Sequence, residues 1–179
     1  MKTIPWEVDE RKFSDAYVAG FFDGDGSLVA TLEKQSSRYL RAYRPRIKIN
    51  FTQHIRHFDT LCEIQKYLDA GKVSIASAHD QAELVIVDRN EVSRILNRML
   101  PHLVLKKQQA VLALEALSQF GENLRTNRIS DENYSSIVKT IVKIRDLNSN
   151  TGGKRKFASF DPVTTSPLKR RESVYSSLR

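Results

Sequence analysis

This sequence has almost no sulfur chemistry and no membrane-spanning stretch. Its single cysteine, Cys62, rules out a disulfide within the chain, and no Cys/His group has zinc-site spacing. Cys62 lies in an apolar helical pattern and is expected to pack as a small hydrophobe. No apolar run approaches the ~20 residues that span a bilayer. Residues 1–7 lack the apolar core of a signal peptide. We therefore expect an intracellular protein with no membrane partner.

Acidic residues are outnumbered. The chain has 29 Lys and Arg against 21 Asp and Glu, a net charge of +8, and a pI near 9.7. Such a balance favours a polyanionic partner. The 179 residues suit one domain with a real core. We expect a polar lead-in over 1–12, one domain over 13–150 and a loosely ordered basic tail over 151–179.

The most informative stretch is AYVAGFFDGDGSL at 16–28, an apolar segment that runs into a turn with two carboxylates. Ala19 and Gly20 leave a flat strip that another backbone can approach closely. Gly24 and Gly26 are expected to end the helix by adopting backbone angles that side chains disfavour.

The two carboxylates, Asp23 and Asp25, would face the negative end of the helix dipole. A divalent cation relieves that conflict, and so does plain solvation. An EF-hand calcium loop is excluded, because its required glycine and glutamate positions hold Leu28 and Lys34.

A second stretch, RPRIKINFTQ at 44–53, alternates with a period of two. One face is apolar, and the other carries Arg44, Arg46, Lys48 and Asn50. Three cations and an amide along one pleat suit a two-stranded ribbon in the DNA major groove. The alternative is an edge strand that its cations keep soluble.

Periodicity and caps predict the remaining elements, and no internal repeat is present. We expect strands and helices in the order helix, two strands, helix, two strands and three helices. The segments after the first helix are strands at 27–33 and 44–53, a helix at 55–68, strands at 72–78 and 82–87, and helices at 90–100, 106–120 and 130–147.

The nine residues VAGFFDGDG at 18–26 resemble the signature of the LAGLIDADG homing endonucleases, most closely the single-motif members encoded in group I introns. The resemblance covers about 13–156. It implies an α+β fold with an αββαββα core, an antiparallel DNA-binding sheet and C-terminal helices. It also implies a homodimer in which the signature helices pack through Ala19 and Gly20, over a long, nearly palindromic DNA site.

The resemblance further implies an active site. Asp25 is its metal-binding carboxylate with the Gly24 carbonyl beside it, and Mg²⁺ is the implied metal. Asp23 is expected to be structural. Gln53 matches the polar residue that organises water around the scissile phosphate. The segment LKKQQA at 105–110 matches the one that carries the active-site lysine, which falls on Lys106.

The sequence departs from the family pattern at one position. Related enzymes often carry an arginine four residues after the glutamine, where this chain has His57, preceded by Arg56. Either side chain can take the cationic role, and His57 can equally be an ordinary surface or helix-cap histidine.

DNA contacts are expected from the ribbon and its neighbours. Readers of base edges are Arg44, Arg46, Lys48 and Asn50, joined by Thr31, Glu33 and Glu83, although the glutamates can also be plain exposed carboxylates. Phosphate contacts are expected from the basic cluster Lys154, Arg155 and Lys156, for which a solubilising tail is the alternative.

The implied function is site-specific, metal-dependent hydrolysis of double-stranded DNA. The first alternative is a non-cleaving nucleic-acid binder of the same fold, either a maturase that binds intron RNA or a DNA-binding regulator. The second is a basic structural protein whose Asp-Gly-Asp-Gly is only a turn. The resemblance suggests a chloroplast or mitochondrion, with a nucleus left open.

Overall fold

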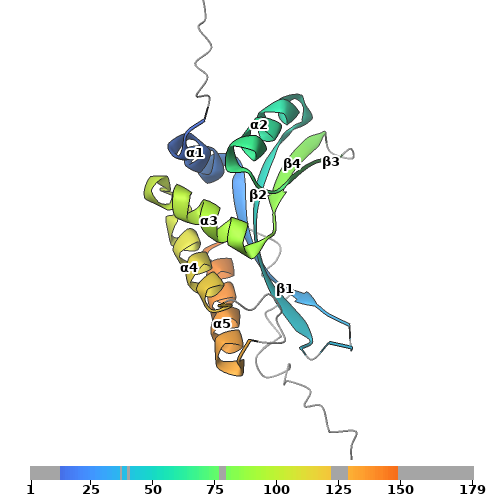
Figure 1. Cartoon of the computed structure of the whole chain (residues 1–179), viewed down its shortest axis with the longest axis vertical. Helices are drawn as coiled ribbons and strands as arrows, with labels where there is room; N and C mark the ends of the chain where they lie inside the picture. Colours follow the sequence, from blue (N-terminus) through green and yellow to red (C-terminus); the bar gives the residue numbers. More distant parts are fainter. Residues whose placement is uncertain (1–12, 37, 40, 77–79, 122–128, 149–179) are drawn as a thin grey trace, which may run out of the picture.

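The computed structural model describes residues 13–36, 38–39, 41–76, 80–121 and 129–148. Its order of helices and strands follows the prediction, with an antiparallel sheet and helices in an α+β arrangement (Figure 1). The elements are α1 Asp15–Asp25, β1 Gly26–Lys34, β2 Tyr43–His54, η1 Ile55–His57, α2 Phe58–Leu68, β3 Lys72–Ala76, β4 Gln81–Ile86, α3 Arg89–Met99, η3 Leu100–His102, α4 Lys107–Ser118 and α5 Asp131–Leu147.

The sheet has the strand order β1-β2-β4-β3, and every neighbouring pair is antiparallel. β1 pairs with β2 from Gly26↔Phe51 to Lys34↔Tyr43. β4 pairs with β2 only over Ile49–His54. The outer half of β2, Tyr43–Lys48, is therefore paired with β1 alone, and this two-stranded ribbon projects from the sheet at the lower right of Figure 1.

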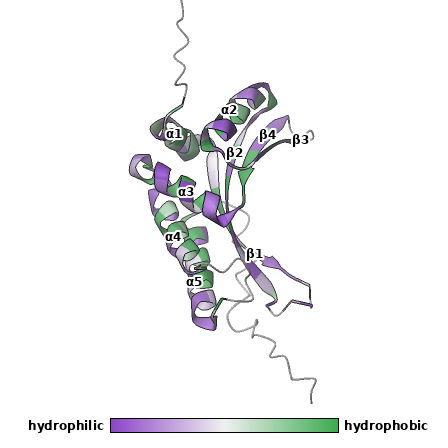
Figure 2. Cartoon of the chain, in the orientation of Figure 1, coloured by the Kyte–Doolittle hydropathy of each residue, from purple (hydrophilic) through white to green (hydrophobic). Residues whose placement is uncertain are grey.

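One face of the sheet is buried against the helices, as the alternation predicts. Along β1 and β2 the inward side chains are buried, whereas their neighbours are partly exposed. The helices carry apolar and polar residues on different faces (Figure 2). Fully buried Leu or Ile side chains each stabilise the fold by about 1.5–3 kcal/mol relative to exposure. They include Ile49, Leu61, Ile64, Leu84, Ile86, Ile95 and Ile141.

Local caps explain where several helices begin. The Ser14 hydroxyl accepts a hydrogen bond from the Tyr17 N–H at 3.1 Å and starts α1. Asp88 accepts from the N–H groups of Asn90 and Glu91 and starts α3. Ser130 accepts from the Asn133 N–H at 3.1 Å and starts α5. Each cap satisfies donors that have no partner inside the helix.

The end of α1 differs from the expectation about its glycines. α1 continues through Gly24 to Asp25, and Gly26 has an extended backbone with φ −88°. Gly26 is needed for space, because a Cβ there would collide with the Phe22 ring and lie 2.7 Å from the Phe22 carbonyl oxygen. The chain thus passes directly from the helix into β1 without a left-handed residue.

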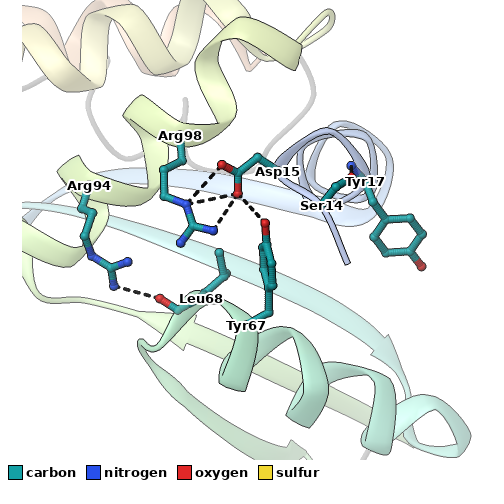
Figure 3. Close-up of polar contacts among 7 residues, drawn as sticks. All are labelled: Ser14, Asp15, Tyr17, Tyr67, Leu68, Arg94 and Arg98. Carbon is teal, nitrogen blue, oxygen red and sulfur yellow. Dashed lines mark hydrogen bonds and ion pairs between the residues drawn. The ribbon is translucent and has the colours of Figure 1, made fainter. Parts of the chain in front are cut away.

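A polar cluster joins three helices near the start of α1 (Figure 3). Asp15 of α1 accepts from Arg98 of α3 at 2.7 Å and from the Tyr67 hydroxyl of α2 at 2.9 Å. The hydrogen bond from Arg98 is the main cause that holds the pKa of Asp15 below its ordinary value, against the opposing effect of burial. Arg94 of α3 donates to the Leu68 carbonyl at 2.8 Å.

Two further details differ from the sequence-based expectation. The segment predicted as one helix over 55–68 begins with the short 3₁₀ turn η1 before α2. Val111 belongs to the apolar pattern of the helix predicted over 106–120, but it is 48% exposed. Within the described part of the chain, no helix has both the length and the apolar character that a bilayer crossing requires.

Among the described residues, two glycines have a left-handed backbone, and replacing each by alanine distinguishes steric collision from backbone strain. Gly71 (φ +80°) and Gly121 (φ +55°) both disfavour a side chain, but only at Gly71 would a Cβ meet other atoms, 2.6 Å from Ile86 Cγ1. We expect Gly121→Ala to lower the free energy of unfolding by about 1–2 kcal/mol. Gly71→Ala should cost about 1–3 kcal/mol more because of overpacking. Urea unfolding of both variants measures this, and equal losses would contradict the steric argument.

Candidate functional site

The two carboxylates at the end of α1 point to different surroundings. Asp23 and Asp25 are two residues apart, which places them roughly 200° around the helix axis. Asp23 is only 8% exposed, whereas Asp25 is exposed. One carboxylate therefore faces the protein's own interior and the other faces outward.

Asp23 holds the segment that leads into α4. Its carboxylate accepts three backbone hydrogen bonds, from Val104 at 2.7 Å, Leu105 at 3.1 Å and Lys106 at 2.9 Å. Lys106 is the N-cap of α4 and provides no side-chain cap of its own. Asp23 thus caps α4 from another helix, at the positive end of the α4 dipole.

These donors determine the charge state of Asp23. Burial acts to raise its pKa, but the N–H groups of Val104, Lys106 and Leu105 and the positive charge of Lys106 outweigh burial. The pKa of Asp23 therefore lies below its ordinary value, and the group is ionised at neutral pH. The expected structural role of Asp23 agrees with these contacts.

Asp25 lies beside the end of β2. Gln53 Nε2 donates to Asp25 Oδ2 at 2.7 Å, and β1 and β2 are paired at Gly26↔Phe51. The structure thus brings together two residues that are 28 positions apart in the sequence. Both side chains lie at the inner end of β2, the end farther from the two-stranded ribbon.

Lys106, from the segment before α4, lies at the same end of α1 as Asp25. Its ammonium donates to the Asp23 carbonyl oxygen at 2.5 Å and lies 5.7 Å from the centroid of the Phe22 ring. That carbonyl belongs to the last turn of α1, where the helix dipole favours a cation. Lys106 is therefore held at the helix end that also presents Gly24 and Asp25.

The donor set fits a hard divalent cation that keeps most of its waters. Asp25 offers one outward carboxylate, and Gly24 is exposed beside it. In the described ranges, no three His, Cys, Asp or Glu side chains gather into a complete metal site. Mg²⁺ is commonly held by one or two carboxylates plus waters and substrate phosphates, so a second Asp25 and a phosphodiester would complete such a set.

Arg56 and His57 lie just beyond Gln53, in η1. Arg56 Nε donates to His57 Nε2 at 3.3 Å, and the Arg56 N–H donates to His54 Nδ1 at 3.2 Å. His57 occupies the N-cap position of α2 without a side-chain cap hydrogen bond. Both side chains are exposed, and the choice of Arg56 or His57 for the cationic role stays a prediction.

The proposed base readers share the sheet face that points away from the helices. Thr31, Lys48, Asn50 and Glu83 alternate with buried neighbours, and Arg44 is exposed. Arg46 Nη1 is paired with the Glu33 carboxylate at 3.0 and 3.1 Å. Asn50 Oδ1 is buried and has no hydrogen-bond partner within the described structure.

The expected dimer strip is only half at the surface. Ala19 is fully buried within its own protomer, so it cannot form a surface strip with Gly20. Consecutive helix residues point in different directions, so Ala19 and Gly20 do not share one surface. Gly20 is exposed, and a Cβ there would meet nothing within 4 Å. Lys154, Arg155 and Lys156 lie outside the described residues.

Comparison with known proteins gives a decisive match. The family model described as LAGLIDADG endonuclease matches residues 18–114, more than half of the chain. The chain belongs to the LAGLIDADG endonuclease family. The match includes α1 from Val18 onward, the whole sheet and Lys106.

Two curated members of the LAGLIDADG endonuclease family are similar in sequence. The DNA endonuclease I-CvuI of Chlorella vulgaris is 34% identical over 112 residues, which cover 62% of this chain and 66% of I-CvuI. The DNA endonuclease I-CreI of Chlamydomonas reinhardtii is 23% identical over 157 residues, covering 88% of this chain and 92% of I-CreI.

Solved structures of I-CvuI are similar in fold. The complex of I-CvuI with its target in the presence of Ca aligns with a TM-score of 0.69 and 25% identity, covering 77% of this chain and 83% of I-CvuI. A second I-CvuI complex, with the I-CreI target and Mg, contains uncleaved DNA and has the same TM-score.

Sequence reasoning missed one buried charge. Arg41 lies between the strands predicted at 27–33 and 44–53, in a polar segment where a cation is ordinarily exposed, but its side chain is only 1% exposed. Its contacts are with the start of α5, about 90 residues later in the chain. No local signal reveals this burial, because the residues around Arg41 have the composition of a surface loop.

The role of Asp23 predicts a pH-dependent loss of stability in Asp23→Asn. An amide cannot accept three N–H donors without turning its own NH₂ toward one, so unfolding free energy at pH 7 should fall by about 1–3 kcal/mol. The pKa of Asp23 in the folded protein lies below 3.8, the ordinary value for an aspartate. The stability that ionised Asp23 contributes is therefore lost as the pH falls below 3.8 and through the folded pKa. The gap between variant and wild type should therefore narrow in acid.

The measurement is urea unfolding of Asp23→Asn from pH 7 to pH 3, with Asp25→Asn as the matched control. Asp25 is exposed, so its amide variant should leave stability nearly unchanged. An equal loss in both variants would show that Asp23 has no special structural role.

Proposed function

We propose that this protein is a site-specific double-strand DNA endonuclease that acts as a homodimer and hydrolyses phosphodiesters with Mg²⁺. The observation that carries the proposal is the pairing of Asp25 with Gln53 at 2.7 Å, beside a lysine held at the same helix end. The family membership supports endonuclease activity, and the similar proteins I-CvuI and I-CreI are DNA endonucleases.

The chain's own residues divide the work of phosphodiester hydrolysis. A bound divalent metal supplies charge stabilisation and a more acidic water. Asp25 would hold that metal, with the Gly24 carbonyl beside it. Gln53 can orient water or Asp25 through its amide. Lys106, placed at the helix end, can stabilise negative charge that develops on the phosphoryl oxygens.

The exposed surface of α1 supports the proposal of a homodimer. Tyr17, Gly20 and Gly24 recur at helical spacing on one face, all exposed. Beside the end of this helix, Val104 and Leu105 are 79% and 75% exposed, although both are large and apolar. Such a cluster around two glycines fits the close approach of a second, symmetry-related α1. That dimer would bring two Asp25 carboxylates together.

Sequence recognition would come from the sheet face of each protomer. Arg44, Arg46 and Lys48 provide the cations, and a two-fold dimer would read two half-sites of a nearly palindromic target. The net charge of +8 favours a polyanion. Intron RNA as a further partner and an organellar location stay predictions.

The experiment that tests this function is a selection from duplex DNA with randomised half-sites. Purified protein binds the library in Ca²⁺, is then switched to Mg²⁺, and the new ends are sequenced. Defined cuts within a two-fold consensus support the proposal. Enriched but uncut sequences would indicate a non-cleaving binder and direct the next test to intron RNA, and no enrichment would contradict nucleic-acid recognition.

Asp25→Asn should abolish cleavage and retain DNA binding. The amide keeps the size of the side chain and removes the negative charge that would hold the metal. Cleavage of the selected target in Mg²⁺ and a gel-shift assay in Ca²⁺ measure the two properties. Retained cleavage would show that another carboxylate holds the metal.

Arg46→Ala should lower discrimination at a single base pair in each half-site by about 1–3 kcal/mol. The reason is that a guanidinium on a rigid strand reads one base edge. Relative cleavage rates of all single-base target variants measure the loss, with Lys139→Ala, an exposed residue of α5, as the control. Uniform weakening on every target would instead mean that Arg46 contacts phosphate.

A further inference from the structure

Arg41 is a buried cation outside the proposed active site. It lies in the loop that joins β1 to β2, at the tip of the ribbon, and is 1% exposed. Removing a guanidinium from water costs several kcal/mol unless its partners compensate. An arginine in a loop of polar and basic residues is ordinarily exposed to solvent, so the burial of Arg41 needs a specific explanation.

The contacts of Arg41 are strong but incomplete. Arg41 Nη2 donates to the Ile129 carbonyl at 2.7 Å and to Asp131 Oδ1 at 3.1 Å. The guanidinium carbon lies 4.0 Å from the centroid of the Tyr134 ring. Arg41 Nε is buried and has no hydrogen-bond partner in the described structure. The cation also sits at the start of α5, where the helix dipole opposes a positive charge.

This arrangement is poorly suited to stabilising the fold alone. Asp131, the carboxylate that pairs with Arg41 among the described residues, is 70% exposed. An apolar side chain of similar volume often serves a buried site as well or better. Arg41 instead fixes the orientation of its loop relative to α5. A planar guanidinium can bind a carbonyl and a carboxylate and stack on a ring in one geometry only. The geometry points to a positional role.

The part of the sheet that Arg41 ties down is the part with least support. The outer ribbon is two-stranded, since β4 pairs with β2 only from Ile49 onward, and an isolated two-stranded hairpin is marginally stable. Glu33, Arg44 and Arg46 all lie in this region. A second link joins it to α5, because the Tyr134 hydroxyl donates to the Tyr43 carbonyl at 3.1 Å.

We propose that Arg41 is a positioning residue for base recognition. Together with Tyr134 it fastens the tip of the β1–β2 ribbon to the start of α5, and so determines where Glu33, Arg44 and Arg46 meet the outer base pairs of each half-site. This inference rests on the proposed function, since it concerns the same DNA-reading face. Arg41 itself is buried and does not contact DNA.

The test compares specificity profiles of Arg41→Met, Arg41→Lys and Tyr134→Phe on all single-base variants of the selected target. In Arg41→Met, discrimination should fall at least about fivefold at outer positions, while inner positions and the cleavage rate at saturating DNA stay unchanged. Arg41→Lys and Tyr134→Phe should show the same pattern to a smaller degree, because each keeps part of the contact.

Arg38→Met is the matched control, since Arg38 lies in the same loop but is exposed. It should leave the profile unchanged. Thermal melting of Arg41→Met should be equal to or above that of wild type. A profile that changes equally at inner and outer positions, or that stays intact while melting falls, would show that Arg41 is only structural.

A separate readout keeps this inference apart from the nuclease activity. If the wild-type protein binds or cuts no selected DNA, the proposed function fails, but amide hydrogen exchange still reports on the ribbon. Faster exchange over Tyr43–Lys48 in Arg41→Met than in wild type and Arg38→Met would support the tether. Identical exchange in all three proteins would overturn it.

Discussion

The carboxylate of Asp23 is the interaction on which the rest of the site depends. It receives the N–H groups of Val104, Leu105 and Lys106 and thereby joins the end of α1 to the start of α4. The same contact places Lys106 beside the end of α1, where its ammonium donates to the Asp23 carbonyl oxygen. This join helps to hold the helix end that carries Asp25 in a fixed relation to the segment that carries Lys106.

Neighbouring carboxylates in one turn thus have opposite physical situations. Asp23 is buried, and its donors keep it ionised, so its charge is used entirely within the protein. Asp25 is exposed and contacts a neutral amide, so its charge remains available to a ligand. The division depends on helix geometry, because a separation of two residues places side chains on nearly opposite faces.

The two-stranded ribbon and the contacts that join it to α5 are the second main feature of the structure. The sheet supports β2 on both sides only near the proposed active site, where β1 and β4 both pair with it. Farther out, the ribbon depends on α5 through Arg41 and Tyr134. In the proposed function, a buried carboxylate, Asp23, would hold the catalytic end of the site, and a buried guanidinium, Arg41, would hold the DNA-reading ribbon.

The sequence by itself determined the elements, the inward faces of β1 and β2, and the family, because hydrophobic periodicity and the nine-residue signature are local properties. Only the tertiary structure decided that Ala19 is buried while Gly20 is exposed, that Asp23 caps α4, and that Arg41 is enclosed by α5. The contacts of Asp23 and Arg41 join segments about 80 to 90 residues apart. A local pattern carries no information about which distant segment will cover a side chain or supply its hydrogen-bond partner.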